Sequence, residues 1–296
     1  MMLNYIGFYL SYPFLWLAGN MPFWILYRFS DFFYIVVLLV GYRKKVIETN
    51  LRNSFPEKSN SEIRKIRYSF YRHFCDIFVE TIAMQKSNVS RIRKRVRVVN
   101  PEDVNAVLEK GQDVIAVTGH YGNWEWVPSV SDRLNALGVS VYRPLKNPMM
   151  DKYMLMLRSR FGSVNIPKKN TSREIVRYKR SNQRFILGLI SDQSPGKREL
   201  QYWTRFLNQN TPVILGPEKL AKLTDSQLFF WQMEKEKRGQ YKITFIPYEG
   251  NVKDSADYDI TEWHLRLLEK LIVSKPEHWL WSHKRWKYQH LFPGKE

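Results

Sequence analysis

A histidine and a glutamate stand five residues apart at the end of an apolar run. Residues 114–125 read VIAVTGHYGNWE, so that His120 closes the run and Glu125 follows it. Gly119 and Gly122 allow the tight turn that lets the two side chains face one another. A carboxylate beside an imidazole fixes the ring tautomer and stabilises the imidazolium that forms when the ring accepts a proton. The spacing therefore predicts a general base with its orienting acid, although a structural histidine closing a strand has the same pattern.

Metal and nucleophile chemistry fit the sequence less well. The helical zinc motif needs two histidines four residues apart, and no second histidine lies near His120, so no metal site is expected. No G-x-S-x-G segment offers a nucleophilic serine. Cys75 falls inside an amphipathic helical pattern, where a cysteine fills the core, and a single cysteine permits no intrachain disulfide. We therefore expect neither a covalent enzyme intermediate nor a cofactor.

The elements around His120 predict an α/β fold, with a central sheet flanked by helices. Ligands in such sheets bind at the carboxyl ends of strands, where both His120 and Asp192 fall. Asn60 or Ser61 is expected to cap the first helix. The expected strands are residues 114–118, 139–142, 185–190, 228–233 and 241–247. The expected helices are residues 60–84, 123–137, 148–160, 171–181, 212–224 and 258–274.

Charged side chains near these strand ends extend the predicted site. Arg158 and Arg160 close the helix expected at residues 148–160, where cations also complement the helix dipole. Arg158 would hold a phosphate or fix either Glu125 or Asp192, since a guanidinium pairs bidentately with both kinds of anion. Asp192 has the simpler alternative of a turn or cap residue.

Further polar residues are expected to contact substrate. Gln193 stands beside Asp192, ahead of a turn at residues 194–196. Three tryptophans near the C-terminal end of the sequence, Trp279, Trp281 and Trp286, are predicted to pack in the core or to anchor at a membrane interface. The expected substrate contacts are Arg143, Arg160, Gln193 and Arg285, with Glu277 and His283 as further candidates.

The first part of the chain is strongly apolar. Residues 1–27 contain no charged side chain, and FFYIVVLLV follows at residues 32–40. The stretch is long enough for a bilayer and rich in the aromatic residues of membrane interfaces, but it lacks the basic start and cleavage site of a signal peptide. Pro13, Asn20 and Pro22 interrupt it, so an embedded or re-entrant helical pair fits as well as one spanning helix. A buried core helix is the alternative.

The chain is also strongly basic, with a formal charge of +19 from 47 basic and 28 acidic residues. Residues 42–100 supply +10 of it, with 15 Lys/Arg against 5 Asp/Glu. YRKK at 42–45 directly follows the apolar stretch, and RIRKRVRVV at 91–99 forms an exposed strand or helix edge. Such patterns favour an anionic membrane surface on the cytoplasmic side. We therefore expect a membrane anchor at residues 1–41 and one globular domain at residues 42–296. A membrane-anchored nucleic-acid-binding protein is the alternative, but no recognised nucleic-acid reader motif occurs.

Sequence blocks that occur in order along the chain carry a resemblance to a known family. GHYGNWE has the H-x4-E form of the H-x4-D/E motif of glycerolipid acyltransferases. From the apolar start to PEHWLWSHKRWK at 276–287, the chain resembles the bacterial lipid A biosynthesis acyltransferases, the lauroyl and myristoyl transferases, which are related to mycobacterial phosphatidylinositol mannoside acyltransferases. The other blocks are VYRPLKNPMMD (141–151), LRSRFG (157–162), SDQSPG (191–196) and TRFLNQNTPVILGPEKLA (204–221).

The resemblance implies an acyltransferase on the cytoplasmic face of the inner membrane. The donor would be an acyl-carrier-protein thioester, with acyl-coenzyme A possible, and the acceptor a hydroxyl of a lipid A precursor in late secondary acylation. His120 and Glu125 match the family's catalytic pair, and Arg158 and Asp192 fall on its important arginine and acid. A lysophospholipid, an amino-acid lipid or a glycolipid would serve the same residues as acceptor.

The expected mechanism is direct acyl transfer. His120, oriented by Glu125, would remove the proton of the acceptor hydroxyl, which attacks the thioester carbonyl. Backbone N–H groups of the turn or Arg158 would stabilise the oxyanion, and Arg158 with Asp192 would organise the site.

Overall fold

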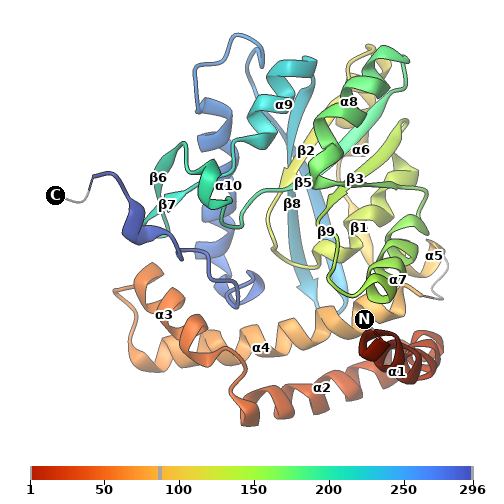
Figure 1. Cartoon of the computed structure of the whole chain (residues 1–296), viewed down its shortest axis with the longest axis vertical. Coiled ribbons are helices and arrows are strands. Elements are labelled where there is room, and N and C mark those ends of the chain that lie inside the picture. The colour runs from red at the N-terminus through yellow and green to blue at the C-terminus, as the bar shows by residue number, and fades with distance from the viewer. Residues whose placement is uncertain (1, 86–88, 295–296) are drawn as a thin grey trace.

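The computed structural model describes residues 2–85 and 89–294, and within them one sheet of seven strands lies between layers of helices (Figure 1). The strand order is β1-β9-β8-β2-β5-β3-β4, and neighbours pair in parallel except β8 with β9. Two further strands, β6 and β7, form a separate antiparallel hairpin. The predicted α/β class is thus confirmed. The strands are β1 (Val96–Val98), β2 (Val114–Thr118), β3 (Leu137–Tyr142), β4 (Val164–Pro167), β5 (Phe185–Ile190), β6 (Trp203–Phe206), β7 (Gln209–Pro212), β8 (Gln227–Lys237) and β9 (Gln240–Pro247).

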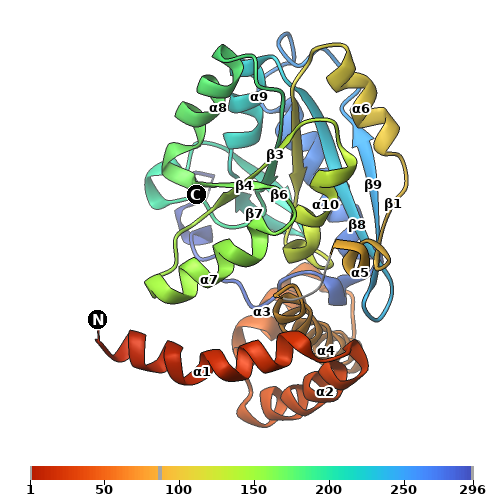
Figure 2. The same ribbon diagram turned by 90° about the vertical axis from the view of Figure 1, so that its right-hand side faces the viewer.

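The helices fall into an N-terminal group below one end of the sheet and a set that covers the sheet faces (Figures 1 and 2). The N-terminal group is α1 (Met2–Asn20), α2 (Phe23–Val40), α3 (Lys44–Ser54) and α4 (Asn60–Ala83). The others are α5 (Val89–Arg93), α6 (Pro101–Glu109), α7 (Pro148–Ser159), α8 (Thr171–Arg180), α9 (Gly216–Thr224) and α10 (Asp259–Ser274). Short 3₁₀ segments are η1 (Trp124–Arg133), η2 (Lys168–Asn170), η3 (Lys197–Glu199), η4 (Pro276–His278) and η5 (Gln289–Leu291).

Strand β2 is buried on both faces, which explains its unbroken apolar run. Val114 and Ala116 pack into the core cluster that includes Trp126, whereas Ile115 and Val117 pack into the cluster on the opposite face. Parallel strands covered by helices on both sides show such continuous apolar sequences. The strand that carries His120 to its position is therefore a rigid central element.

All five predicted strands form, but two predicted helices differ from expectation. The segment expected as a helix at 123–137 is the 3₁₀ segment η1, because Pro128 lies inside it and β3 already begins at Leu137. The helix expected at 212–224 begins only at Gly216, since Pro212 ends β7. The capping residue of α4 is Ser59, not Asn60 or Ser61; it forms a capping box with Glu62.

The apolar N-terminal segment folds as two helices, α1 and α2, that meet at Met21 and Pro22. In the described residues, α2 is the one helix long and apolar enough to cross a membrane by length and composition, which is weak evidence on its own. It packs along α4, and Ser30 of α2 donates to Asp76 Oδ1 of α4 at 2.8 Å. Large exposed apolar side chains of α1 and α2 include Leu10, Phe14, Leu17, Trp24, Phe32, Ile35, Leu39 and Val40.

A buried carboxylate, Glu80 of α4, ties three parts of the molecule together. It accepts hydrogen bonds from Tyr27 of α2 (2.9 Å), Tyr241 of β9 (2.7 Å) and the Asn123 amide (2.7 Å). Asn123 belongs to the turn that carries His120, so the N-terminal helices and this turn share one polar anchor. Burial and the charge of Asp76 raise the pKa of Glu80 to about 7, although the tyrosines and Lys235 oppose the shift.

The raised pKa of Glu80 predicts a pH-dependent stability. The folded state holds the Glu80 proton more tightly than the unfolded chain, so stability falls as the pH rises from below the unfolded value of 4.5 through 7. We expect this group to cost about 2–3 kcal/mol of unfolding free energy between pH 5 and pH 8. Glu80→Gln should flatten that part of the profile in chemical denaturation. An unchanged slope in this variant would assign the pH dependence to other groups.

Candidate functional site

The turn after β2 is shaped by two glycines. A Cβ on Gly119 would lie 2.7 Å from Leu268 Cδ1 and 3.1 Å from Asp192 Oδ2, so no side chain fits there. Gly122 has φ +64° and packs against Met233, a conformation and a contact that favour glycine. The turn is further held by His73 of α4, whose Nε2 lies 3.1 Å from the Gly122 carbonyl oxygen.

The carboxylate that orients His120 is Asp192, not Glu125 as the sequence predicts. β2 and β5 are parallel neighbours, and Ser191 N donates to Thr118 O at 3.1 Å just beyond their ends. His120 and Asp192 therefore emerge side by side. The His120 Nδ1 lies 2.6 Å from Asp192 Oδ1, and the His120 backbone N–H donates to Asp192 Oδ2 at 2.7 Å.

Asp192 is held as a carboxylate. It is 3 % exposed, and the Trp279 indole also donates to its Oδ2 at 2.7 Å. Burial alone would raise the pKa of Asp192, but His120 and these hydrogen bonds lower it to about 2. An ionised acceptor on Nδ1 places the proton of a neutral His120 on that nitrogen, so Nε2 carries the lone pair.

The His120 ring is partly accessible, and its Nε2 contacts a single side chain. The His120 side chain is 17 % exposed, whereas that of Asp192 is 2 % exposed. Gln193 Nε2 lies 3.2 Å from His120 Nε2, a geometry in which the amide donates to the ring. The Trp124 ring meets the imidazole edge-on at 5.2 Å between centroids. A substrate hydroxyl that replaced the Gln193 amide would find a basic nitrogen ready to accept its proton.

Glu125 instead forms a bidentate ion pair with Arg158 of α7. Arg158 Nε donates to Glu125 Oε2 at 3.0 Å, and Nη2 donates to Oε1 at 2.8 Å. This is one of the roles that the sequence left open for Arg158. Burial alone would lower the pKa of Arg158, but the Glu125 charge and hydrogen bonds raise it above its usual range. Arg158 is thus a fixed cation beside Glu125 of the H-x4-E segment, and its Nη1 takes no part in this pair.

The backbone amides of the turn are largely occupied by protein acceptors. The His120 N–H donates to Asp192, the Gly122 N–H to the His278 carbonyl at 3.0 Å, and the Asn123 N–H to Met233 Sδ at 3.2 Å. They cannot also serve an oxyanion without breaking these bonds. Of the two expected oxyanion donors, turn amides and Arg158, the turn amides are therefore the less available.

The other residues expected to contact substrate differ in how far they are buried. Arg143 and Arg160 lie on the surface, on the loop after β3 and at the end of α7. Burial lowers the pKa of His283 to about 4, so the ring is neutral. Its Nε2 accepts from the Ser194 N–H at 3.3 Å and so supports the loop after Asp192. Glu277 lies in η4, next to His278, whose carbonyl accepts from the Gly122 N–H, but its side chain forms none of the hydrogen bonds described for His120.

Arg285 is buried to 1 % exposure, and its Nε, Nη1 and Nη2 have no hydrogen-bond partner among the described residues. Burial lowers its pKa to about 10, against the opposing charge of Asp192, so it remains a cation at neutral pH. Its backbone is fixed by the loop of Gln193, because Ser194 Oγ donates to the Arg285 carbonyl. A buried cation of this kind complements an anionic group or the Asp192 carboxylate.

Sequence reasoning missed two polar partners of the site. Trp279, expected as packing or as an interfacial anchor, is 3 % exposed and hydrogen-bonds Asp192. Asn123 is fully buried and anchors the turn to Glu80. Both belong to the sequence blocks that carry the family resemblance, which was the available signal. In the parts of the chain that the structure describes, no group of three or more His, Cys, Asp or Glu side chains is placed to hold a metal ion.

Comparison with known proteins gives one consistent family. Residues 1–288 match the family model described as bacterial lipid A biosynthesis acyltransferase. The lipid A biosynthesis lauroyltransferase of Escherichia coli (strain K12) is 22 % identical over 275 residues, which are 92 % of this chain and 89 % of the relative. The palmitoleoyltransferase of the same organism is 23 % identical over 83 % of this chain and 79 % of its own length. A lipid A biosynthesis acyltransferase of Haemophilus influenzae (strain ATCC 51907 / DSM 11121 / KW20 / Rd) is 19 % identical over 94 % of this chain and 86 % of its own length. The chain is an acyltransferase and belongs to the bacterial lipid A biosynthesis acyltransferase family.

Proposed function

We propose that the protein transfers a fatty acyl chain from an acyl-carrier-protein thioester to a hydroxyl of a lipid A precursor, as a late secondary acylation. The observation that carries the reaction type is the pair of His120 and Asp192, in which the ring Nε2 contacts only the Gln193 amide that an acceptor hydroxyl would replace. The relatives, a lauroyltransferase and a palmitoleoyltransferase of lipid A biosynthesis, support the acceptor and the fatty acyl donor.

Each step of the proposed reaction has a defined proton donor and acceptor. His120 Nε2 takes the proton of the acceptor hydroxyl while the oxygen attacks the thioester carbonyl carbon. Asp192 stabilises the imidazolium through Nδ1, and Arg158 stabilises the tetrahedral oxyanion. When the intermediate collapses, the C–S bond breaks and the imidazolium returns its proton to the departing thiolate. The products are an ester and a free thiol, with no acyl-enzyme.

The role proposed for Arg158 predicts a loss that lysine cannot rescue. Arg158→Lys keeps the charge but cannot pair bidentately with Glu125 while directing a further N–H at the oxyanion. We expect kcat to fall about 10²-fold, comparable to loss of one oxyanion donor, with a small change in KM. Steady-state kinetics of this variant should be set beside Arg180→Lys, an exposed arginine of α8, which we expect to retain wild-type kcat. A wild-type kcat in Arg158→Lys would exclude the arginine from transition-state stabilisation.

The exposed apolar surface of α1 and α2 supports membrane association. Phe14, Leu39 and Val40 are 75 %, 82 % and 75 % exposed. Such a concentration of exposed apolar side chains on two helices differs from the single apolar residues scattered over the surface of a soluble protein. Because α2 lies along α4 and is bonded to it, we propose that residues 1–41 sit in the membrane interface beside the domain of residues 42–296. The basic residues that follow favour the cytoplasmic face of the inner membrane and an acidic carrier protein as partner.

Transfer assays with purified protein test this function. Labelled acyl groups of several chain lengths, carried on acyl carrier protein or on coenzyme A, are offered with a lipid A precursor or a lysophospholipid. We expect a new ester on the lipid A precursor, with acyl carrier protein the better donor, by lipid mass spectrometry. Transfer to the lysophospholipid alone would contradict the acceptor, and preference for coenzyme A would contradict the donor.

A further inference from the structure

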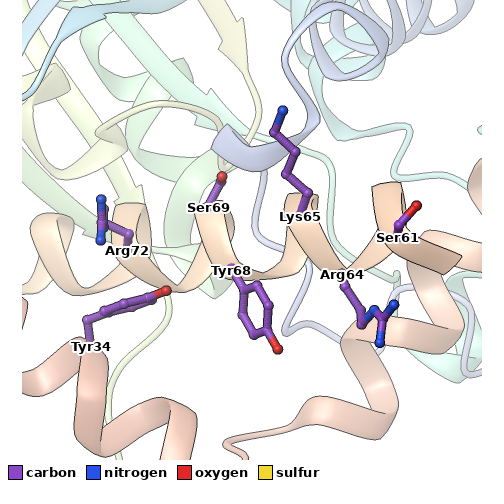
Figure 3. Close-up of a pocket in the computed structure, with 7 residues that line it drawn as sticks. All are labelled: Tyr34, Ser61, Arg64, Lys65, Tyr68, Ser69 and Arg72. Carbon is purple, nitrogen blue, oxygen red and sulfur yellow. The ribbon is translucent and has the colours of Figure 1, made fainter.

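A basic groove lies on the outer face of α4, where α2 packs beside it. Its volume is about 440 Å³. Figure 3 shows the α4 side chains on successive turns, with the Tyr34 ring supplied by α2. Their spacing of three and four residues places them on one helix face. The lining residues are Tyr34, Ser61, Arg64, Lys65, Tyr68, Ser69 and Arg72.

The cations of this groove have no acidic partner. Among the described residues, no carboxylate lies within ion-pair distance of Arg64, Lys65 or Arg72. The nearest acids of α3 and α4 are engaged elsewhere. Glu48 pairs with Arg67, and Glu62 is bound to Ser59 in the capping box. Three cations and several hydroxyl groups therefore line this face of α4 with no carboxylate paired to the cations, and such donors suit an anion.

The two aromatic side chains of the groove, Tyr34 and Tyr68, each stack with an arginine. The Arg72 guanidinium stacks over the Tyr34 ring with 5.0 Å between the guanidinium carbon and the ring centroid. The guanidinium carbon of the buried Arg67 lies 4.8 Å from the centroid of the Tyr68 ring, and this contact restricts the ring. Stacking restricts the arginine and the tyrosine to defined positions and lowers the entropy that a ligand would have to remove.

The groove is separate from the catalytic pair. On the buried face of the same helix, His73 contacts the turn of His120, whereas Arg64, Tyr68 and Arg72 are exposed on the other face. Exposed apolar side chains of α2, Phe33 and Ile35, flank Tyr34 in the sequence, and Phe33 meets Phe78 of α4 edge-on at 6.0 Å. An anion bound here would therefore lie at the boundary between a cationic and an apolar surface.

We infer that this groove binds the phosphate of an anionic glycerophospholipid of the surrounding bilayer. The cations match its charge, Ser61, Ser69 and Tyr68 supply neutral donors, and the adjacent apolar side chains match its acyl chains. A soluble phosphate compound would make no use of that apolar rim. This inference rests on the membrane association proposed for α1 and α2, but not on the acyl-transfer chemistry.

Vesicle sedimentation of the full chain tests the groove. Phosphatidylcholine vesicles are used with and without phosphatidylglycerol, and partition is measured for wild type and for Arg64→Gln/Arg72→Gln. Each basic residue at an anionic surface contributes about fivefold, so we expect about 30-fold weaker partition of the double variant into phosphatidylglycerol vesicles. The matched control is Lys169→Gln/Arg180→Gln, which removes the same charge from η2 and the end of α8. Helix α8 lies far from α2 (Figure 2). We expect this control to change partition less than about twofold. An equal loss in both pairs would overturn the site in favour of net charge alone.

A variant that keeps the charge distinguishes specific headgroup binding from general electrostatic attraction to the vesicle surface. Arg64→Lys/Arg72→Lys keeps both charges and removes their forked geometry, so we expect about fivefold weaker partition, the size of one lost hydrogen bond. Wild-type partition in this variant would overturn a headgroup site. Binding of inorganic phosphate that is lost in Arg64→Gln/Arg72→Gln, together with unchanged vesicle partition of that variant, would overturn the lipid as ligand.

Two further measurements separate this inference from the proposed function. Leu39→Ser/Val40→Ser should weaken partition into both kinds of vesicle, and a wild-type chain that sediments with neither would overturn membrane association itself. Activity of Arg64→Gln/Arg72→Gln on detergent-dispersed substrates should equal that of wild type. A fall in that activity would place the acceptor lipid, not a bilayer lipid, in the groove.

Discussion

Replacement of Asp192 by asparagine is expected to lower kcat by about 10³- to 10⁴-fold, with little change in KM. The carboxylate accepts from His120 Nδ1 at 2.6 Å, which keeps the lone pair on Nε2. An asparagine that turns its amide nitrogen toward the ring would stabilise the opposite tautomer, and it cannot neutralise an imidazolium. Loss of the carboxylate from a comparable histidine–aspartate pair in a serine protease costs about 10⁴ in kcat.

Glu125→Gln is the matched control for Asp192→Asn. Both changes replace a carboxylate by an amide in the site, but Glu125 contacts Arg158 and not the His120 ring. We expect Glu125→Gln to cost about 10²-fold in kcat, through the loosened arginine. Full kinetics of the two variants, with thermal unfolding to verify the fold, distinguish these roles. A larger loss in Glu125→Gln than in Asp192→Asn would return the orienting role to Glu125.

The pH profile offers a second view of the same carboxylate. Because His120 and the Trp279 indole hold the pKa of Asp192 at about 2, it stays ionised throughout the range in which the protein is folded and active. Protonation of Asp192 therefore adds no limb to the profile of wild type above pH 4. Trp279→Phe removes a donor to the same oxygen and should raise the pKa of Asp192 toward its usual value.

The sequence identifies the central strands but not their neighbours. Residues 114–118 and 185–190 are continuous apolar runs, and both form strands with those bounds as β2 and β5. That they lie side by side depends on the whole strand order, which no local pattern contains. His120 and Glu125 are close in sequence, so a turn suggests that they pair; Asp192, 72 residues away, reaches His120 only through the sheet.

Local patterns also fail where proline and polar residues act together. The apolar spacing after Asn123 resembles a helix, yet Pro128 and the buried indole of Trp126 give the 3₁₀ segment η1. This segment directs the Glu125 side chain toward Arg158 of α7 and not back toward the imidazole of His120. The short strands β1, β4, β6 and β7 have three or four residues each and too few apolar positions for an alternating pattern.

The N-terminal helices illustrate a different limit. Their apolar composition predicts a membrane segment, and α1 and α2 do expose apolar side chains. Composition could not show that Tyr27, Ser30 and Asp31 bond to α4 and to Arg238, because these partners are distant in sequence. The polar residues of the segment, with the buried Phe8, Phe23 and Leu26, fix its orientation on the domain, and many of its other apolar residues face outward.

Replacement of His120 by alanine is expected to lower kcat by 10⁴-fold or more, the largest effect among single changes. Without Nε2 the acceptor hydroxyl has no general base, and the departing thiolate has no proton donor. KM for the lipid should change little, since the imidazole acts on the reacting atoms. Exposed His290 is the control, and His290→Ala should keep wild-type kinetics.

The double variant His120→Ala/Asp192→Asn decides whether the two residues act as one unit. If Asp192 works only through the imidazole, its loss costs nothing further once the ring is gone, so the double variant should match His120→Ala within about threefold. Independent roles would instead multiply, giving a loss of 10⁷-fold or more for the pair. A multiplied loss would mean that Asp192 contacts the substrate directly. It would also make the hydrogen bond from Nδ1 a structural link and not the means by which His120 becomes a base.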